Sequence, residues 1–211
     1  MKKLTFGLAA VATLALTGTA QAQICAGFPT IDRGFSFGAS VQLPEGADFG
    51  DVYGVDASYN ASGPLALFGG LTVAEGGAED LEIYEVGLAL ETPSIGLMIG
   101  PSVSACPQVS VQFADEAGGS TINVPVGFGI GANLTQGTGL AIMPYVIPQV
   151  VFARFNADDD FPLLEDESDT FFGIEGGVLV GMGMFFFGGT IDHVFEDGAD
   201  PVFGIRAGIR I

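Results

Sequence analysis

Residues 95–113, IGLMIGPSVSACPQVSVQF, decide the fold class of this chain. Every second residue from Ile95 to Phe113 is apolar or proline, and the residues between them are mostly glycine, serine and glutamine. Successive side chains of a β-strand point to opposite sides, so a period of two predicts a strand with one apolar and one polar face. We expect the apolar face to lie against hydrocarbon and the other to line a polar interior.

Nine further segments carry the same alternation, most clearly 121–134 and 202–211. An even number of strands returns both ends of the chain to one side of a membrane. We therefore predict an all-β fold, a single antiparallel up-and-down transmembrane β-barrel of ten strands. Eight strands are the alternative, because two segments are short and one is rich in glycine. The ten segments are 34–42, 52–59, 64–74, 81–90, 95–113, 121–134, 140–154, 170–180, 184–193 and 202–211.

Composition agrees with this fold class and excludes others. The chain has 33 glycines, 18 phenylalanines and no tryptophan, a balance that favours strands and turns over helices. The formal net charge of −19 excludes nucleic acid as a partner. No apolar run is long enough for a membrane-spanning helix. A soluble β-sandwich is disfavoured, because the polar faces of these strands carry mainly glycine and serine.

The first residues predict export. Met1, Lys2 and Lys3 form a basic start, residues 4–16 are apolar, and Ala20-Gln21-Ala22 is typical of a cleavage site. We therefore predict a cleaved signal peptide over 1–22, an N-terminal segment over 23–33 and the barrel over 34–211. Removal of the signal leaves four basic residues, which are Arg33, Arg154, Arg206 and Arg210.

The predicted connections alternate between short ones and longer acidic ones. Short turns fall at 60–63, 91–94, 135–139 and 181–183, and longer connections fall at 43–51, 75–80, 114–120, 156–169 and 194–201. Short periplasmic turns and longer outer loops are typical of bacterial barrels. One acidic loop contains weak candidate ligands for a divalent cation, although it lacks the ordered spacing of a calcium loop and a solvated loop is the alternative. These candidates are Asp158, Asp159, Asp160 and Asp166.

Charged residues also fall on the predicted inner face, where opposite charges should pair. We expect a structural ion-pair network that fills a closed barrel, because unpaired buried charge is unfavourable. The alternative is a polar constriction of a narrow pore. The residues concerned are Asp56, Glu85, Glu175, Asp192, Arg206 and Arg210.

The two cysteines, Cys25 and Cys106, predict one disulfide in an exported chain. Cys106 lies on the inner face of its strand, and the residues between Cys25 and Gly34 are long enough to reach it. We therefore hypothesise that the N-terminal segment folds into the lumen as a small plug.

At this point the whole mature chain resembles the small outer-membrane β-barrel proteins of the OmpA and OmpX type. The most local motif is the C-terminal strand 203–211, FGIRAGIRI, with apolar residues at alternate positions to the end. The resemblance implies an outer-membrane location, recognition of this strand by the barrel-assembly machinery, and contact with outer-membrane lipid and lipopolysaccharide. The family usually ends in an aromatic residue, and Ile211 departs from this pattern. Outer-membrane enzymes of this general architecture place a histidine near an acid at the outer rim, and Asp192-His193 is similar to that arrangement.

From these features we expect a monomer with a structural or surface-interaction role that presents acidic outer loops, without catalysis and without a cofactor. The first alternative is a porin-like, cation-preferring narrow pore, which a glycine- and serine-rich inner face would permit. An outer-membrane enzyme that uses His193 comes third.

Overall fold

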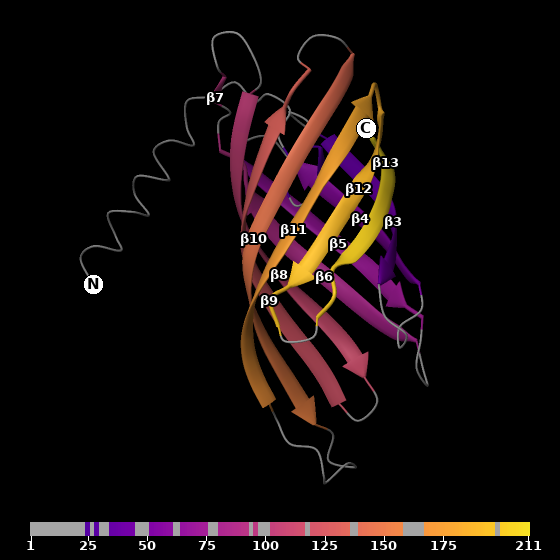
Figure 1. Ribbon diagram of the computed structural model, residues 1–211, viewed down its shortest axis with the longest axis vertical. Coiled ribbons are helices and arrows are strands. Elements are labelled where there is room, and N and C mark those ends of the chain that lie inside the picture. The colour runs from indigo at the N-terminus through magenta and orange to yellow at the C-terminus, as the bar shows by residue number, and fades with distance from the viewer. Residues whose placement is uncertain are drawn as a thin grey trace, which may run out of the picture.

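The computed structural model describes residues 24–25, 28–29, 34–44, 51–60, 64–75, 80–92, 95–96, 102–116, 119–135, 139–157, 167–196 and 199–211. All secondary structure within these ranges is β-strand (Figure 1). None of these ranges contains a helix long and apolar enough to cross a membrane.

Ten antiparallel strands form a closed barrel, as the sequence predicts. Each of the ten barrel strands pairs with the next barrel strand along the chain, so β6 pairs with β8, and the last strand, β13, pairs with the first, β3. Two smaller elements lie outside the wall order, the pair β1 (Ile24–Cys25) with β2 (Phe28–Pro29) and the short β7 (Ile95–Gly96). The barrel strands are β3 (Gly34–Pro44), β4 (Val52–Asn60), β5 (Leu65–Ala74), β6 (Leu81–Leu90), β8 (Ser102–Glu116), β9 (Gly119–Asn133), β10 (Leu140–Ala157), β11 (Glu167–Met182), β12 (Phe185–Val194) and β13 (Val202–Arg210).

The segment 95–113 is not one strand. Ile95 and Gly96 of β7 pair antiparallel with Val103 and Ser102 of β8, so the chain reverses direction between the two elements. The intervening sequence contains Gly100-Pro101, a pair typical of a turn. The predicted loop over 114–120 is also wrong, because β8 continues to Glu116 and β9 begins at Gly119. The regular alternation of residue types therefore gave no sign that the chain reverses direction between β7 and β8. The acidic residues near 115 were wrongly interpreted as a loop, although they belong to β8.

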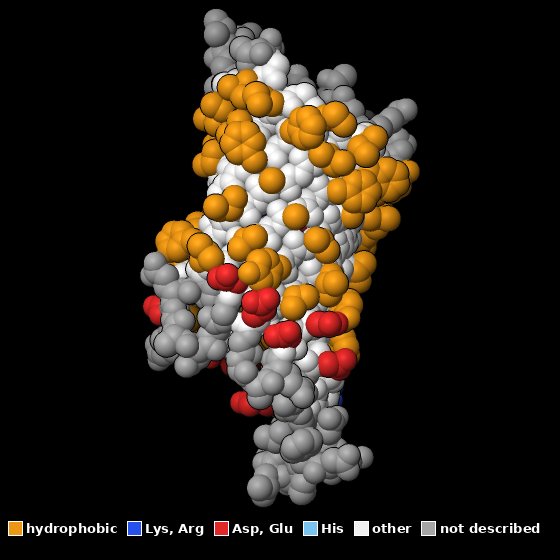
Figure 2. Space-filling view, turned by 90° about the vertical axis from the view of Figure 1, so that its right-hand side faces the viewer, with side chains coloured by type: hydrophobic (Ala, Val, Ile, Leu, Met, Phe, Trp, Pro, Cys, Tyr) orange, Lys and Arg blue, Asp and Glu red, His pale blue; other side chains and the backbone are white. Residues whose placement is uncertain are grey.

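The barrel wall has an apolar outer face and a small or polar inner face over most of its height. On β13 the outward Phe203 and Ile205 are exposed, whereas the inward Gly204 and Arg206 are buried. Figure 2 shows hydrophobic side chains distributed over the wall and acidic side chains gathered at one end. An apolar outer belt of this kind is what membrane hydrocarbon requires of a barrel.

Strands β8 to β11 are longer than the other strands and continue beyond the barrel at the end away from the C-terminus (Figure 1). Pairing of β11 with β12 ends at Gly173 and Val194, whereas pairing of β11 with β10 continues to Glu167. Pairing of β8 with β6 ends at Ala114 and Ile83, so beyond these points the four strands form a projecting sheet that pairs with no other described barrel strand. We define the projecting sheet as residues 115–116, 119–123, 153–157 and 167–171.

Candidate functional site

The half of the lumen nearer the short turns is filled by an apolar layer of large side chains. Met143, Tyr145 and Ile147 of β10 pack with Leu179 of β11 and Phe186 of β12, and each is at most 6% exposed. Phe68 and Ala141 pack against this group, and a second buried cluster of Ala66, Ala89 and Cys106 also contacts Phe68. The apolar layer therefore joins side chains from β5, β6, β8, β10, β11 and β12.

Glycines opposite the apolar layer make room for it. A Cβ atom on Gly208 would overlap the Phe186 ring and the carbonyl oxygen of Phe37. The sequence suggested that small inner-face residues would leave water-filled space. At this height in the barrel, bulky neighbouring side chains pack against those small residues instead. This part of the sequence-based interpretation is corrected, because β10 and β11 carry large apolar residues on their inner faces.

A polar cavity of about 300 Å³ lies between the apolar layer and the acidic end of the barrel. Phe68 belongs to both the apolar layer and the cavity lining. Most of the remaining lining consists of glycine and of polar side chains contributed by nearly every strand of the wall. The charged residues of the lining are Asp56, Glu85, Glu175, Asp192 and Arg206.

The cavity brings together five of the six residues predicted for the inner network. Arg206 Nη2 forms an ion pair with Asp56 Oδ2. Gln112 Nε2 donates to Glu85 Oε1 at 3.3 Å, and Asp192 lies directly opposite Glu175 in the strand register. The ion pair of Arg206 with Asp56 links strands from the two ends of the sequence. It can form because β13 pairs with β3, and β3 pairs with β4, which carries Asp56.

Two features of this network differ from the sequence-based prediction. Arg210 does not line the cavity, because it lies beyond the apolar layer and its Nε donates to the Gly183 carbonyl oxygen at 2.7 Å. Tyr145 was not predicted, yet its hydroxyl donates to Glu175 Oε1 at 2.9 Å. A tyrosine in a strand with apolar residues on both faces gives no sequence signal of a polar role.

The N-terminal pair of strands lies close to the wall that carries Cys106. Cys106 is fully buried on β8, and β1, which contains residue Cys25, lies against β8 and β9. No cysteine among the described side chains is a free thiol. The Cys25 to Cys106 disulfide and the plug formed by 23–33 stay predictions.

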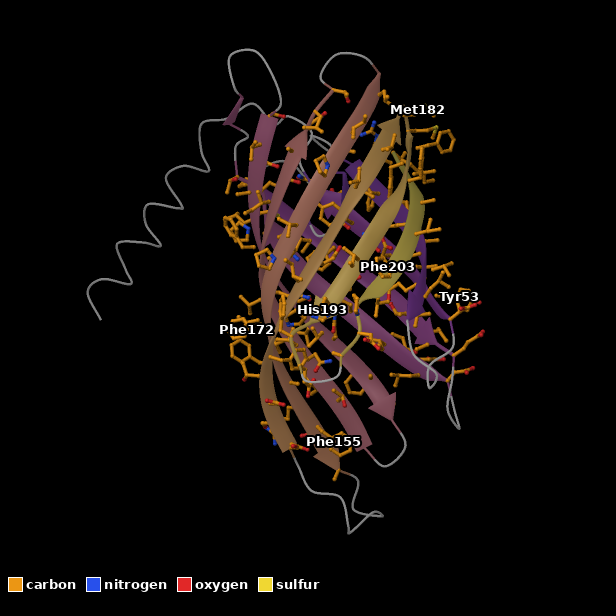
Figure 3. All side chains as sticks on the ribbon, viewed as in Figure 1. Tyr53, Phe155, Phe172, Met182, His193 and Phe203 are labelled. Carbon is orange, nitrogen blue, oxygen red and sulfur yellow. The ribbon has the colours of Figure 1, made fainter. Side chains whose placement is uncertain are left out.

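His193 does not form a pair with Asp192. Asp192 lines the cavity, whereas His193 follows it on the strand and therefore points to the outer side of the wall (Figure 3). There its ring packs edge-to-face against Phe195, with ring centroids 4.9 Å apart. The rim dipeptide that suggested an enzyme is thus divided between the two faces of the wall.

The acidic residues considered as cation ligands, Asp158, Asp159, Asp160 and Asp166, lie outside the described residues. Within the described ranges, no group of three histidine, cysteine, aspartate or glutamate side chains is arranged to hold a metal ion.

Solved structures that are similar to this chain include two bacterial proteins. LpxR from Salmonella typhimurium is 12% identical, with 83% of this chain and 100% of LpxR covered and a TM-score of 0.45. Ail, the attachment invasion locus protein of Yersinia pestis, is 10% identical, with 85% of this chain and 99% of Ail covered and a TM-score of 0.33. No protein-family profile and no curated protein sequence matches the chain.

The expectation of a barrel without catalysis is corrected. One fold can host both enzymes and proteins without activity, so the barrel fold gives no ground for excluding catalysis.

Proposed function

We propose that this protein is an integral outer-membrane barrel that acts by interaction at the cell surface, through its projecting sheet. The observation that carries the proposal is an inversion of polarity along β10 and β11. Up to Phe152 and Phe172 nearly all outward residues are large and apolar, and beyond them the outward residues are Arg154, Ser168 and Thr170. A sheet with a polar outer face is suited to water rather than to hydrocarbon.

The projecting sheet also offers an open strand edge. The carbonyl oxygen of Phe172 accepts a hydrogen bond from the Phe195 N–H, so Phe172 directs its backbone groups toward β12. The backbone groups of Ser168 and Thr170 point to the same side, because they are two and four residues away. No described strand pairs there, and Asp169 Oδ1 accepts from the Thr170 N–H at 2.6 Å. An edge of this kind can accept an added strand from a partner.

The charge of the projecting sheet favours a cationic partner. Its described acidic residues outnumber its one basic residue, Arg154, and the sequence of the connection from 158 to 166 adds further acids. The acidic members of the projecting sheet are Asp115, Glu116, Glu167 and Asp169. An extended segment rich in lysine or arginine would match both the edge and its charge.

The alternative of a narrow cation-preferring pore is disfavoured by the apolar layer. Ions cross a barrel only through a hydrated path, and the apolar layer fills the lumen with side chains that are almost fully buried. An outer-membrane location, cleavage of residues 1–22, insertion through the C-terminal strand and contact with lipopolysaccharide are parts of the same proposal, supported by the apolar belt and the sequence signals.

The test measures binding of a nine-residue peptide of alternating lysine and threonine to the purified protein, by fluorescence anisotropy in detergent. We compare the wild type with Ser168→Pro, which removes a backbone N–H at the open edge, and with Ser168→Ala, which keeps it. We expect Ser168→Ala to bind like the wild type and Ser168→Pro to bind at least about tenfold more weakly. A glutamate-threonine peptide should not bind. Equal binding by both variants, or no binding by the wild type, would refute the edge as the interaction site.

A further inference from the structure

The charges that line the lumen cavity do not balance one another. Asp56, Glu85, Glu175 and Asp192 contribute four carboxylates, and Arg206 is the one basic side chain among the described lining residues. When all of them are ionised, three negative charges remain uncompensated in a confined volume. Such an arrangement is unfavourable unless protons or a bound cation offset it.

The excess lies on the side of the cavity formed by β11 and β12. Glu175 and Asp192 are directly opposite each other on these neighbouring strands, and like charges in that position repel. Arg206 is engaged by Asp56, and Tyr145 gives Glu175 a hydrogen bond without adding positive charge. Asp192 makes no side-chain hydrogen bond within the described part of the chain, so its carboxylate is available to a ligand.

A largely buried serine on the cavity wall also needs a polar occupant of the cavity. Ser110 of β8 lines the cavity and is only 6% exposed, yet its side chain makes no hydrogen bond within the described ranges. The polar groups of folded proteins are normally satisfied, so the Ser110 side chain depends on an occupant of the cavity for its hydrogen bond.

The arrangement suits an organic cation better than a metal ion. The four carboxylates come from four different strands, and within the described ranges no three side chains converge as metal ligands do. Phe68 and Ile83 add apolar surface to the lining of the cavity. Spaced carboxylates separated by apolar surface match amines joined by methylene groups. A volume of about 300 Å³ is at the lower end of the range for small-molecule sites.

We propose that the lumen cavity binds a small organic cation of the diamine or polyamine class, with one ammonium group at Asp192 and Glu175 and the other near Glu85. This site is separate from the projecting sheet, so binding of the lysine-threonine peptide and binding of an amine can fail independently.

The test titrates 1,4-diaminobutane into the protein purified from membranes in detergent, by isothermal titration calorimetry at low ionic strength. The neutral analogue 1,4-butanediol is the ligand control. Asp192→Asn keeps the shape of the side chain and removes its charge, and Glu85→Gln does the same across the cavity. Glu167→Gln, on the projecting sheet, is the matched control for loss of one carboxylate. Heat-modifiable migration on gels checks that each variant is folded.

We expect 1,4-diaminobutane to bind the wild type and Glu167→Gln alike, and Asp192→Asn and Glu85→Gln at least about tenfold more weakly. The butanediol should give no measurable heat of binding. No binding of the diamine to the wild type, or equal weakening in Glu167→Gln, would overturn the proposal. Displacement of the diamine by Mg²⁺ at equal concentration would instead assign the cavity to a metal ion, and would overturn the organic-cation assignment.

Discussion

Replacing Phe186 by alanine tests the apolar layer directly. The ring is 1% exposed and packs among Leu179, Met143 and Ile147, so its removal leaves a cavity that its neighbours fill only in part. Substitutions of this kind destabilise by about 3–5 kcal/mol, the sum of a lost transfer free energy and a cavity contribution. We expect the free energy of unfolding of Phe186→Ala, measured by urea titration in lipid vesicles, to fall by that amount.

The neighbouring Phe187 is the matched control, because it points outward and is half exposed on the apolar belt. Phe187→Ala loses a similar transfer free energy, about 1.5–3 kcal/mol, but lipid chains fill the space and no internal cavity forms. We therefore expect Phe186→Ala to lower the unfolding free energy by more than Phe187→Ala does. Equal losses in the two variants would refute the conclusion that a packed layer fills this half of the lumen.

Two further predictions concern the unfolding free energy of the wall and its inner face. Arg206→Met leaves the Asp56 carboxylate without its ion-pair partner and should lower the free energy of unfolding by about 3–5 kcal/mol. The double variant Arg206→Met/Asp56→Asn should recover most of this loss. A single variant as stable as the wild type would contradict the pairing. Gly188→Ala places a Cβ atom on the Val178 carbonyl oxygen and should lower the free energy of unfolding by about 3 kcal/mol or prevent refolding. At the control position Gly189 the nearest atom to a new Cβ is 3.8 Å away, so alanine there should change the free energy of unfolding by less than about 0.5 kcal/mol. Similar effects at the two glycines would show that the close strand contact is not present.

The strands could be predicted from the sequence because lipid imposes one rule on every outward position. Val109 and Ile205 are apolar for the same reason, so alternation identifies the wall wherever the chain crosses hydrocarbon. The same rule failed between Gly96 and Ser102, because the alternation of residue types continues although β7 and β8 run in opposite directions. It failed again at Arg154, where a polar outward residue suggested the end of a strand and instead marks its exit from the apolar belt.

The lumen could be predicted only in part, because its contents depend on the stagger between strands. Alternation places Asp56 and Arg206 on the inner face, but their meeting depends on the registers of β4 with β3 and of β3 with β13. The same staggers bring Phe186 to the height of Met143 and form the apolar layer. No local pattern around Tyr145 or Arg210 tells which of them reaches the cavity.

The most direct test of the closed lumen is single-channel conductance of the purified protein in planar bilayers, with and without reductant. We expect no steady current steps in either condition, because the apolar layer blocks a hydrated path whether or not the Cys25 to Cys106 disulfide is formed. Steady cation-selective steps from the wild type, with or without reductant, would contradict a closed lumen and would indicate a pore.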